Sequence, residues 1–239
     1  MNRDMKTLMA RHAYETVAVY RDLLLQKEID INKLNIERDW NKLPVMRKET
    51  LATNLDRVIS EHYLADYVMG KLVRMHTSGT TGTCMDIYWD KRDYFKSLVP
   101  LWLKRWKVAG VHPKDKVCFF STCVDISKNE IIEKNALIIS KTNLTMERLY
   151  NIWNKILDFQ PTWLLIQPSM ASLLCNVVLE DDLPKLPTLK YIELTGEMAL
   201  TSLKDKLKEV FRCEIGCHYG TMEAVSYTHL RAHETLRHL

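Results

Sequence analysis

Hydrophobic and polar positions along the chain follow two different periods. Between Met5 and Lys27 apolar side chains recur at helical spacing, which predicts an amphipathic helix. Leu43-Pro44 then interrupts the chain, and Lys48 to Asn54 is expected to form a second, short helix. From about residue 70 onward, short apolar runs of strand type alternate with helical segments. A helical leader over residues 1–60 is therefore expected to precede an α/β domain over residues 61–224.

The alternating region is expected to form a mostly parallel sheet covered by helices. Strand-type runs occupy residues 72–76, 86–89, 116–121, 136–140, 162–167, 189–194 and 214–218. Helical patterns occupy residues 92–108, 144–159, 169–179 and 202–211. Strands that alternate with helices pair in parallel, because each helix carries the chain back to the end of the sheet where the strands begin. Ligands bind at the carboxyl ends of such strands, so the polar segments that follow them are the candidate sites.

Residues 225–239 differ in character from the rest of the chain. The segment reads VSYTHLRAHETLRHL and holds three of the eight histidines. His229 and His233 would share a helix face, as metal ligands can. His233-Glu234 with His238 is similar to a zinc-protease HExxH, but the second histidine comes one residue late and lies about 140° round a helix. The segment resembles translated vector or adapter sequence joined to a broken reading frame, and we expect it to be foreign to the fold.

Charge and hydropathy narrow the classes of function. The chain of 239 residues has 34 basic and 30 acidic residues, a formal charge of +4, which gives no electrostatic case for nucleic acid. No apolar run approaches the roughly 20 residues of a membrane-spanning helix. Residues 1–11 are charged and do not form the apolar region of a secretory signal. We expect a cytoplasmic protein with a small-molecule ligand, and its oligomeric state stays open.

The cysteines are scattered, and several lie in apolar stretches. The six are Cys84, Cys118, Cys123, Cys175, Cys213 and Cys217. This usage is typical of a reduced protein in which cysteine acts as a small buried hydrophobe. Cys213-x-x-x-Cys217-His218 is the arrangement that suggests zinc, but it lacks a fourth ligand at matching spacing. Buried thiols are the favoured interpretation.

A segment rich in hydroxyl groups and glycine follows the strand expected at residues 72–76. Its residues are Thr77, Ser78, Gly79, Thr80, Thr81 and Gly82. The glycines permit a tight turn that exposes successive N–H groups, and the hydroxyl groups add donors, an arrangement suited to a polyphosphate. It is not a Walker A loop, because no Gly-Lys-Ser/Thr follows at the required spacing. By composition alone, a polar surface turn is the plainer interpretation.

Two further polar loops follow strands. Thr195-Gly196-Glu197 comes after the strand at 189–194, and Tyr219-Gly220-Thr221-Met222-Glu223 comes after the strand at 214–218. Glycine lets a ligand approach the backbone closely, tyrosine can stack on a flat ring, and glutamate oxygens can hold a hard cation. Each loop taken alone is also compatible with an ordinary connection.

Together and in this order, the three loops resemble those of the adenylate-forming superfamily of acyl-CoA synthetases. TSGTTG at 77–82 is similar to the phosphate loop of that superfamily, and YGTME at 219–223 is similar to its Tyr-Gly-x-x-Glu motif. Within the superfamily the chain resembles the phenylacetate–CoA ligase branch, which includes coenzyme F390 synthetases and proteins associated with capsular polysaccharide. LPVMRK at 43–48 and Gln167-Pro168-Ser169 carry that likeness. The resemblance covers about residues 15–224 and implies a partial N-terminal domain of an adenylate-forming enzyme.

The resemblance implies a role for each site residue. Residues 77–82 would cradle the β- and γ-phosphates of ATP. Gly196, Glu197 and Tyr219 would line the adenine pocket, with Gly220 in the same loop. Thr221 would contact the α-phosphate and the acyl carboxylate, and Glu223 would bind Mg²⁺. Such an enzyme activates a carboxylic acid as its acyl-AMP and then passes the acyl group to a thiol, commonly coenzyme A.

The chain departs from the family pattern at several points. Thr83-Cys84 stands where proline is usual after the phosphate loop, and Met85-Asp86 stands where Lys-Gly is frequent. Family members are nearly twice as long, so the ribose-binding aspartate, the hinge and the C-terminal lid with its lysine are expected to be missing. Two alternatives therefore stay open. One is acyl activation or adenylyl transfer linked to a cofactor or to capsular polysaccharide, and the other is a non-catalytic nucleotide-binding fragment.

Overall fold

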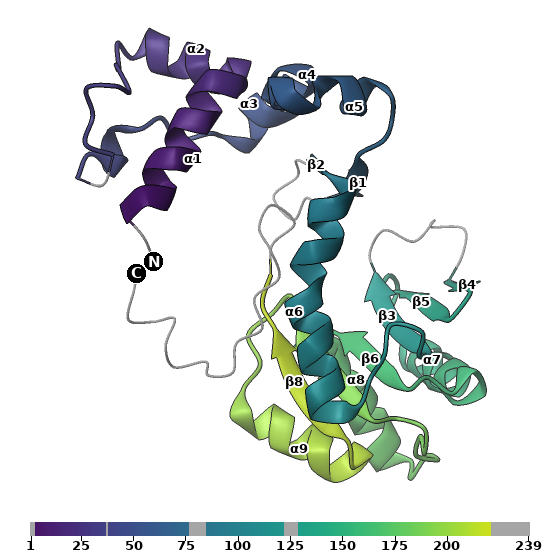
Figure 1. Ribbon diagram of the computed structural model, residues 1–239. Coiled ribbons are helices and arrows are strands. Elements are labelled where there is room, and N and C mark those ends of the chain that lie inside the picture. Colours follow the sequence, from purple (N-terminus) through teal and green to yellow (C-terminus); the bar gives the residue numbers. More distant parts are fainter. Residues whose placement is uncertain (1–2, 37, 77–84, 122–128, 221–239) are drawn as a thin grey trace. The chain divides into compact units, whose positions relative to one another are not determined.

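The computed structural model describes residues 3–36, 38–76, 85–121 and 129–220 (Figure 1). Its contacts divide the chain into two compact units, Met1–Phe95 and Lys96–Leu239. The sequence predicts a different division, into a leader over residues 1–60, a domain over residues 61–224 and a tail over residues 225–239. That division stays a prediction. The foreign-looking segment 225–239 lies outside the described residues.

The first unit is built from short helices and one pair of strands. Its elements are α1 (Arg3–Thr16), α2 (Ala18–Gln26), η1 (Trp40–Lys42), α3 (Lys48–Ala52), α4 (Leu55–Val58), η2 (Glu61–Tyr63), α5 (Leu64–Val68), β1 (Val73–His76) and β2 (Asp86–Trp89). The single helix predicted over residues 5–27 is two helices, because Val17 takes an extended conformation with φ −115° and ψ 104°. Leu24, Ile31 and Ile36 form a small buried cluster beside them.

Strands β1 and β2 pair with each other and form a separate two-stranded sheet. They are antiparallel, with Val73 opposite Trp89 and His76 opposite Asp86. Arg74 supports the pair through an ion contact of 2.7 Å with the carboxylate of Asp86. The expectation that these strands join the large parallel sheet is therefore wrong. The segment between the two strands, residues 77–84, lies outside the described residues.

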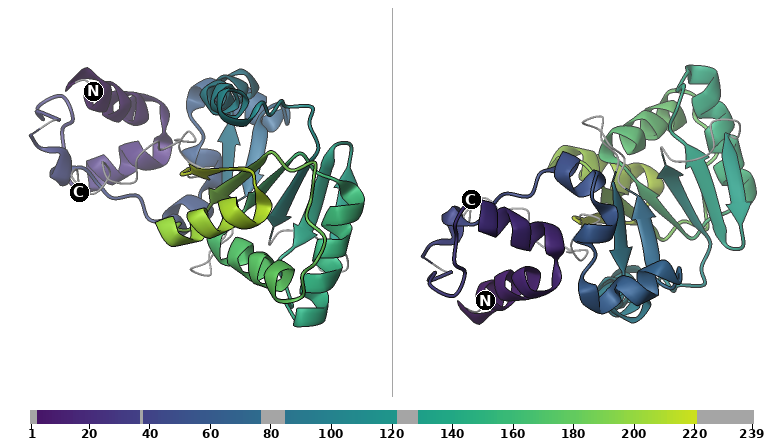
Figure 2. Two further views of the ribbon diagram at one scale, coloured as in Figure 1. Left: turned by 90° about the horizontal axis from the view of Figure 1, so that it is seen from below. Right: turned by 90° about the horizontal axis from the view of Figure 1, so that it is seen from above.

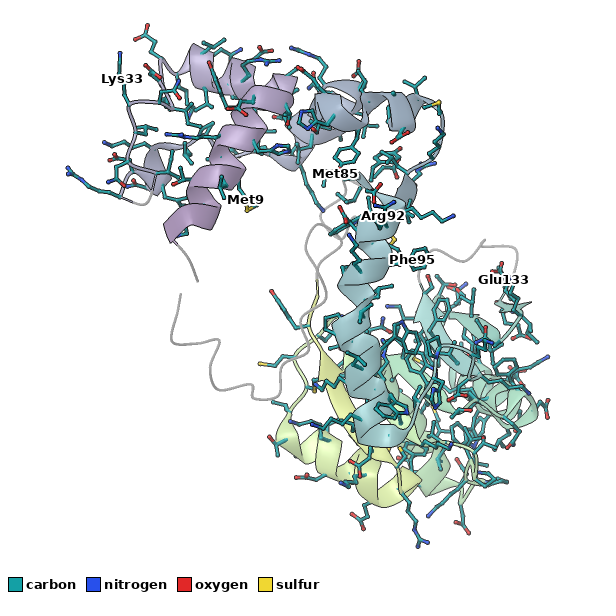
Figure 3. All side chains as sticks on the ribbon, in the orientation of Figure 1. Met9, Lys33, Met85, Arg92, Phe95 and Glu133 are labelled. Carbon is teal, nitrogen blue, oxygen red and sulfur yellow. The ribbon has the colours of Figure 1, made fainter. Side chains whose placement is uncertain are left out.

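The second unit contains a six-stranded sheet in the order β4-β5-β3-β6-β7-β8. The strands are β3 (Val117–Ser121), β4 (Glu130–Glu133), β5 (Ala136–Ser140), β6 (Trp163–Ile166), β7 (Tyr191–Thr195) and β8 (Glu214–His218). Every neighbouring pair is parallel except β4 with β5. Strand β4, which ends at Glu133 on the outer edge (Figure 3), was not predicted. The α/β fold with a mostly parallel sheet is confirmed.

Three helices cover one face of this sheet (Figure 2): α7 (Met146–Phe159), α8 (Pro168–Glu180) and α9 (Thr201–Phe211). In α7 the buried side chains are Leu149, Ile152, Trp153 and Ile156, spaced as one helix face requires. The Thr145 hydroxyl accepts a hydrogen bond of 3.2 Å from the Arg148 N–H and so caps that helix. The main core lies between these helices and strands β3, β5, β6 and β7.

Helix α6 (Lys91–Ala109) packs on the opposite face of the same sheet over its second half. There Trp102 and Ala109 lie against a smaller cluster formed by Val111, Trp163 and Tyr191. Trp153 of α7 is fully buried, and Trp102 lies against the smaller cluster, whereas Trp106 is 56% exposed. In the part of the chain that the structure describes, no helix is long and apolar enough to cross a membrane.

Candidate functional site

Three polar loops leave the carboxyl edge of the sheet from neighbouring strands. Strands β6, β7 and β8 are adjacent and parallel, with Ile166 opposite Leu194 and Thr195 opposite His218. Gln167, Gly196 and Tyr219 are the residues that directly follow these strands. Because neighbouring strands lie about 5 Å apart, the first residues of adjacent loops are close together. The structure thus brings Thr195–Glu197 and Tyr219–Gly220 to one edge of the sheet, and their role as a binding site stays a prediction.

The order of the strands marks this edge as a place for a ligand. After β3 the chain forms β4 and then β5 on one side of β3, and later forms β6 on the other side. In α/β sheets, ligands bind at the carboxyl edge beside such a reversal of strand order. Gln167, the single residue between β6 and α8, borders this switch point.

Gly196 adopts a backbone conformation that suits glycine. Its φ is +79°, and an added Cβ atom would lie 3.7 Å from the side-chain Cγ of Gln167. The space alone would admit a methyl group, so the left-handed conformation explains the glycine here. Beside it, the amide oxygen Oε1 of Gln167 is buried and has no hydrogen-bond partner among the described residues. A buried acceptor without a partner fits a ligand that brings N–H or O–H groups.

Glu197 connects the loop after β7 to the start of α8. Its Oε2 accepts a hydrogen bond of 2.9 Å from the Ser169 N–H, and its Oε1 accepts one of 2.8 Å from the Ser169 hydroxyl. Because α8 begins at Pro168, the carboxylate satisfies one of the free N–H groups at that helix end and complements the helix dipole. Sequence reasoning missed this partnership, and the predicted contact of Glu197 with adenine stays a prediction.

Tyr219 supplies an accessible aromatic ring at the same edge. It directly follows β8 and is 63% exposed, and Gly220 after it is also exposed. An exposed ring at a strand end offers a face on which a planar base can stack. The remaining predicted site residues, 77–82, Thr221 and Glu223, lie outside the described residues.

The described residues give no support to a metal centre of their own. Among residues 3–36, 38–76, 85–121 and 129–220, no group of three His, Cys, Asp or Glu side chains is placed to hold an ion. Cys213, considered for zinc, is buried in the main core, where burial raises the pKa of its thiol to about 12. The predicted Mg²⁺ ligand, Glu223, lies outside the described residues.

Behind the loops lies a buried ionic cluster that sequence reasoning did not find. Arg105 of α6 donates to both carboxylate oxygens of Glu193, from Nε to Oε2 at 2.7 Å and from Nη2 to Oε1 at 2.8 Å. Nδ1 of His218 lies 3.1 Å from the Oε1 of Glu193. Burial alone raises the pKa of Glu193, but the hydrogen bonds from Arg105 and the contact with His218 outweigh it and hold the pKa below its usual value. The sequence contains one signal of this cluster. Glu193 lies inside an otherwise apolar strand, and a buried carboxylate needs a partner.

Comparisons with known proteins agree with this architecture. No protein-family model matches the chain. Protein CapK of Staphylococcus aureus is 22% identical over 224 residues, which are 87% of this chain and 46% of that protein. The structure of 2-hydroxyisobutyryl-CoA ligase with 2-HIB-AMP and CoA in the thioesterification state matches 95% of this chain and 50% of its own, with a TM-score of 0.62 and 16% identity.

A second structure of that ligase, in an open conformation with the same two ligands, gives a TM-score of 0.58 at 16% identity, over 90% of this chain and 48% of its own. The chain therefore spans about half the length of the proteins that it matches. At these identities the likeness establishes architecture. The architecture that the family resemblance implies is confirmed: the chain has the fold of these acyl-CoA ligase structures.

Proposed function

We propose that the chain binds ATP at the carboxyl edge of its sheet and provides part of a site where a carboxylic acid is activated as acyl-AMP. The observation that carries this proposal is the convergence of Gln167, Gly196 and Tyr219 on the ends of three adjacent parallel strands. A fold shared with a ligase whose structures hold 2-HIB-AMP and CoA supports it.

The described residues suit the base of a nucleotide. The exposed ring of Tyr219 would stack on adenine, the left-handed turn at Gly196 would let the base approach the backbone, and Gln167 Oε1 would accept a hydrogen bond from the ligand. Glu197 would act by fixing that turn to the start of α8 through Ser169. These contacts bind and orient the nucleotide without taking part in bond making.

The reaction itself joins two anions, so positioning and charge stabilisation do most of the work. A carboxylate oxygen attacks the α-phosphorus, the bond to the bridging oxygen breaks, and pyrophosphate leaves. We propose that residues 77–82 hold the β- and γ-phosphates and that Thr221 holds the α-phosphate beside the acid. Mg²⁺ held by Glu223 would neutralise phosphate charge. Transfer of the acyl group to coenzyme A would follow, and the phenylacetate–CoA ligase branch is the proposed subfamily.

Exchange of pyrophosphate into ATP, with a panel of aryl and fatty acids, tests the chemistry. We expect exchange with at least one acid for the protein encoded by the whole gene, and a strong loss in Thr81→Val. Thr201→Val, which changes an exposed threonine at the start of α9, is the matched control and should behave like the parent. Absence of exchange with every acid, while ATP still binds, would favour a nucleotide-binding module over a ligase.

A further inference from the structure

The buried cluster of Arg105, Glu193 and His218 supplies none of the proposed contacts to the nucleotide or the acid. The side chains of Arg105 and Glu193 are 6% and 1% exposed, and that of His218 is 14% exposed. Two charges buried this deeply are costly to desolvate, and replacing such pairs with apolar residues is often neutral or stabilising. Stability alone is therefore a weak reason for this arrangement.

The guanidinium of Arg105 is held in one orientation by more than its carboxylate partner. Its central carbon lies 4.5 Å from the ring centroid of Trp102 and 4.5 Å from that of Trp163. The two indoles meet edge to face at 82°. Because both rings are fixed by packing between α6 and β6, the guanidinium presents a rigid fork to Glu193.

The cluster lies directly beneath the two candidate loops. Glu193 is two residues before Thr195 on β7, and His218 is the last residue of β8, immediately before Tyr219. In the sheet register Glu193 is opposite Gly216, so its contact with His218 is diagonal and points toward the carboxyl edge. The contact links β7 and β8 through side chains, with Glu193 two residues before Thr195 and His218 one residue before Tyr219.

The surroundings of Glu193 leave the histidine few other orientations. The space beside Gly216 is filled by the hydroxyl end of Tyr191, since a Cβ atom on Gly216 would lie 2.0 Å from that oxygen. Lys104 of α6 and Cys217 of β8 are further ionisable groups near the cluster. Both ring nitrogens of His218 are buried and neither forms a hydrogen bond of good geometry among the residues that the structure describes, but Nδ1 makes the 3.1 Å contact with the Glu193 carboxylate. The ring orientation therefore depends on Nδ1 and its contact with Glu193.

We propose that Arg105, Glu193 and His218 are positioning residues that fix the loops at Thr195–Glu197 and Tyr219–Gly220 in the geometry that receives the nucleotide. Arg105 orients the Glu193 carboxylate, the carboxylate orients the His218 ring, and the ring sets the direction in which the chain leaves β8. This inference deepens the proposed function and rests on it for the identity of the ligand.

Two variants of His218 separate positioning from simple packing. Asparagine places an amide N–H near the position of Nδ1 and keeps the donor to Glu193, whereas leucine fills the space and removes it. Ile156→Val, a buried change in α7 on the other face of the sheet, is the control for a general loss of packing. The whole chain is used, with AMP as the probe for affinity and hydrogen exchange of backbone amides as a readout that needs no ligand.

We expect His218→Leu to weaken AMP binding about tenfold or more and to raise amide exchange by a similar factor at residues 195–197 and 219–220. His218→Asn should restore both to within about threefold of the parent, and Ile156→Val should change neither loop. Unchanged exchange in His218→Leu, or an equal rise across α8 and α9, would overturn the positioning role. If the parent binds no AMP, the proposed function fails, and the exchange measurements still decide whether the cluster orders the loops.

Discussion

Arg105→Met tests the deeply buried ion pair between α6 and β7. The substitution keeps a long flexible side chain between Trp102 and Trp163 but removes the positive charge. It breaks two charge-assisted hydrogen bonds, of 2.7 and 2.8 Å, and leaves the Glu193 carboxylate without its main partner in a site 1% exposed. Each such bond is worth about 1.5–3 kcal/mol, and breaking one partner of a buried pair typically costs about 3–5 kcal/mol.

We therefore expect Arg105→Met to lower the free energy of unfolding by about 3–5 kcal/mol, a large share of the roughly 5–15 kcal/mol of a typical domain. The loss of two cation–π contacts adds to this, and contacts between the methionine sulfur and the indoles offset part of it. The double variant Arg105→Met/Glu193→Leu leaves no unpaired charge and should recover most of the loss.

Urea unfolding followed by tryptophan fluorescence measures both variants against the parent, with equal m-values as the check that the same transition is compared. Lys208→Met is the control, because Lys208 pairs with Glu214 at 3.4 Å on the surface and should cost at most about 1 kcal/mol. A loss below about 1 kcal/mol in Arg105→Met, or a double variant worse than the sum of the two single ones, would refute the reasoning.

Three further expectations concern the same sheet. Gly216→Ala should destabilise by about 1–3 kcal/mol or more in thermal unfolding, because its Cβ atom would meet the buried Tyr191 hydroxyl end at 2.0 Å; an unchanged midpoint would show that the ring moves freely. Glu197→Ala should cost about 1 kcal/mol, measured in the same way, by leaving the Ser169 N–H at the start of α8 without its acceptor, and no loss would mean that water replaces it. The pKa of Glu193 is held below its usual value near 4.3, so the unfolded chain takes up that proton first as the pH falls. Stability from Glu193 should thus be complete above about pH 5 and decline at lower pH; Glu193→Gln should lack this component, and identical pH profiles would contradict it.

Much of the second unit could be predicted because its signals are local. Leu149, Ile152, Trp153 and Ile156 mark one face of α7 by their spacing alone, and the apolar run at Trp163–Ile166 marks a buried strand. The carboxyl edge followed from strand direction, since parallel strands end on the same side. The positions of Gly196 and Tyr219 were therefore accessible from the sequence.

The rest depends on partners that the sequence does not place. Glu130–Glu133 has only two apolar residues between charges, so its sequence does not identify it as a strand. Strand β4 is defined by its pairing with β5 at the sheet edge. Val17 breaks the first helix without a proline or glycine to mark the position. Arg105 and Glu193 are 88 residues apart in the chain, and no local sequence pattern indicates that they form an ion pair. The separate pairing of β1 with β2 could not be predicted either, because the sequence pattern of a strand does not determine which strand it pairs with.

Chemical-shift mapping of the backbone amides during titration with ATP tests the central claim most directly. We expect saturable shifts concentrated at Gly196, Glu197, Tyr219 and Gly220 below about 1 mM, the upper end of common enzyme affinities. Tyr219→Ala should weaken them, whereas Phe95→Ala, which removes a ring of similar exposure on α6 (Figure 3), should not. Saturable shifts that avoid this edge, or none at all, would contradict a nucleotide site at the carboxyl ends of β6, β7 and β8.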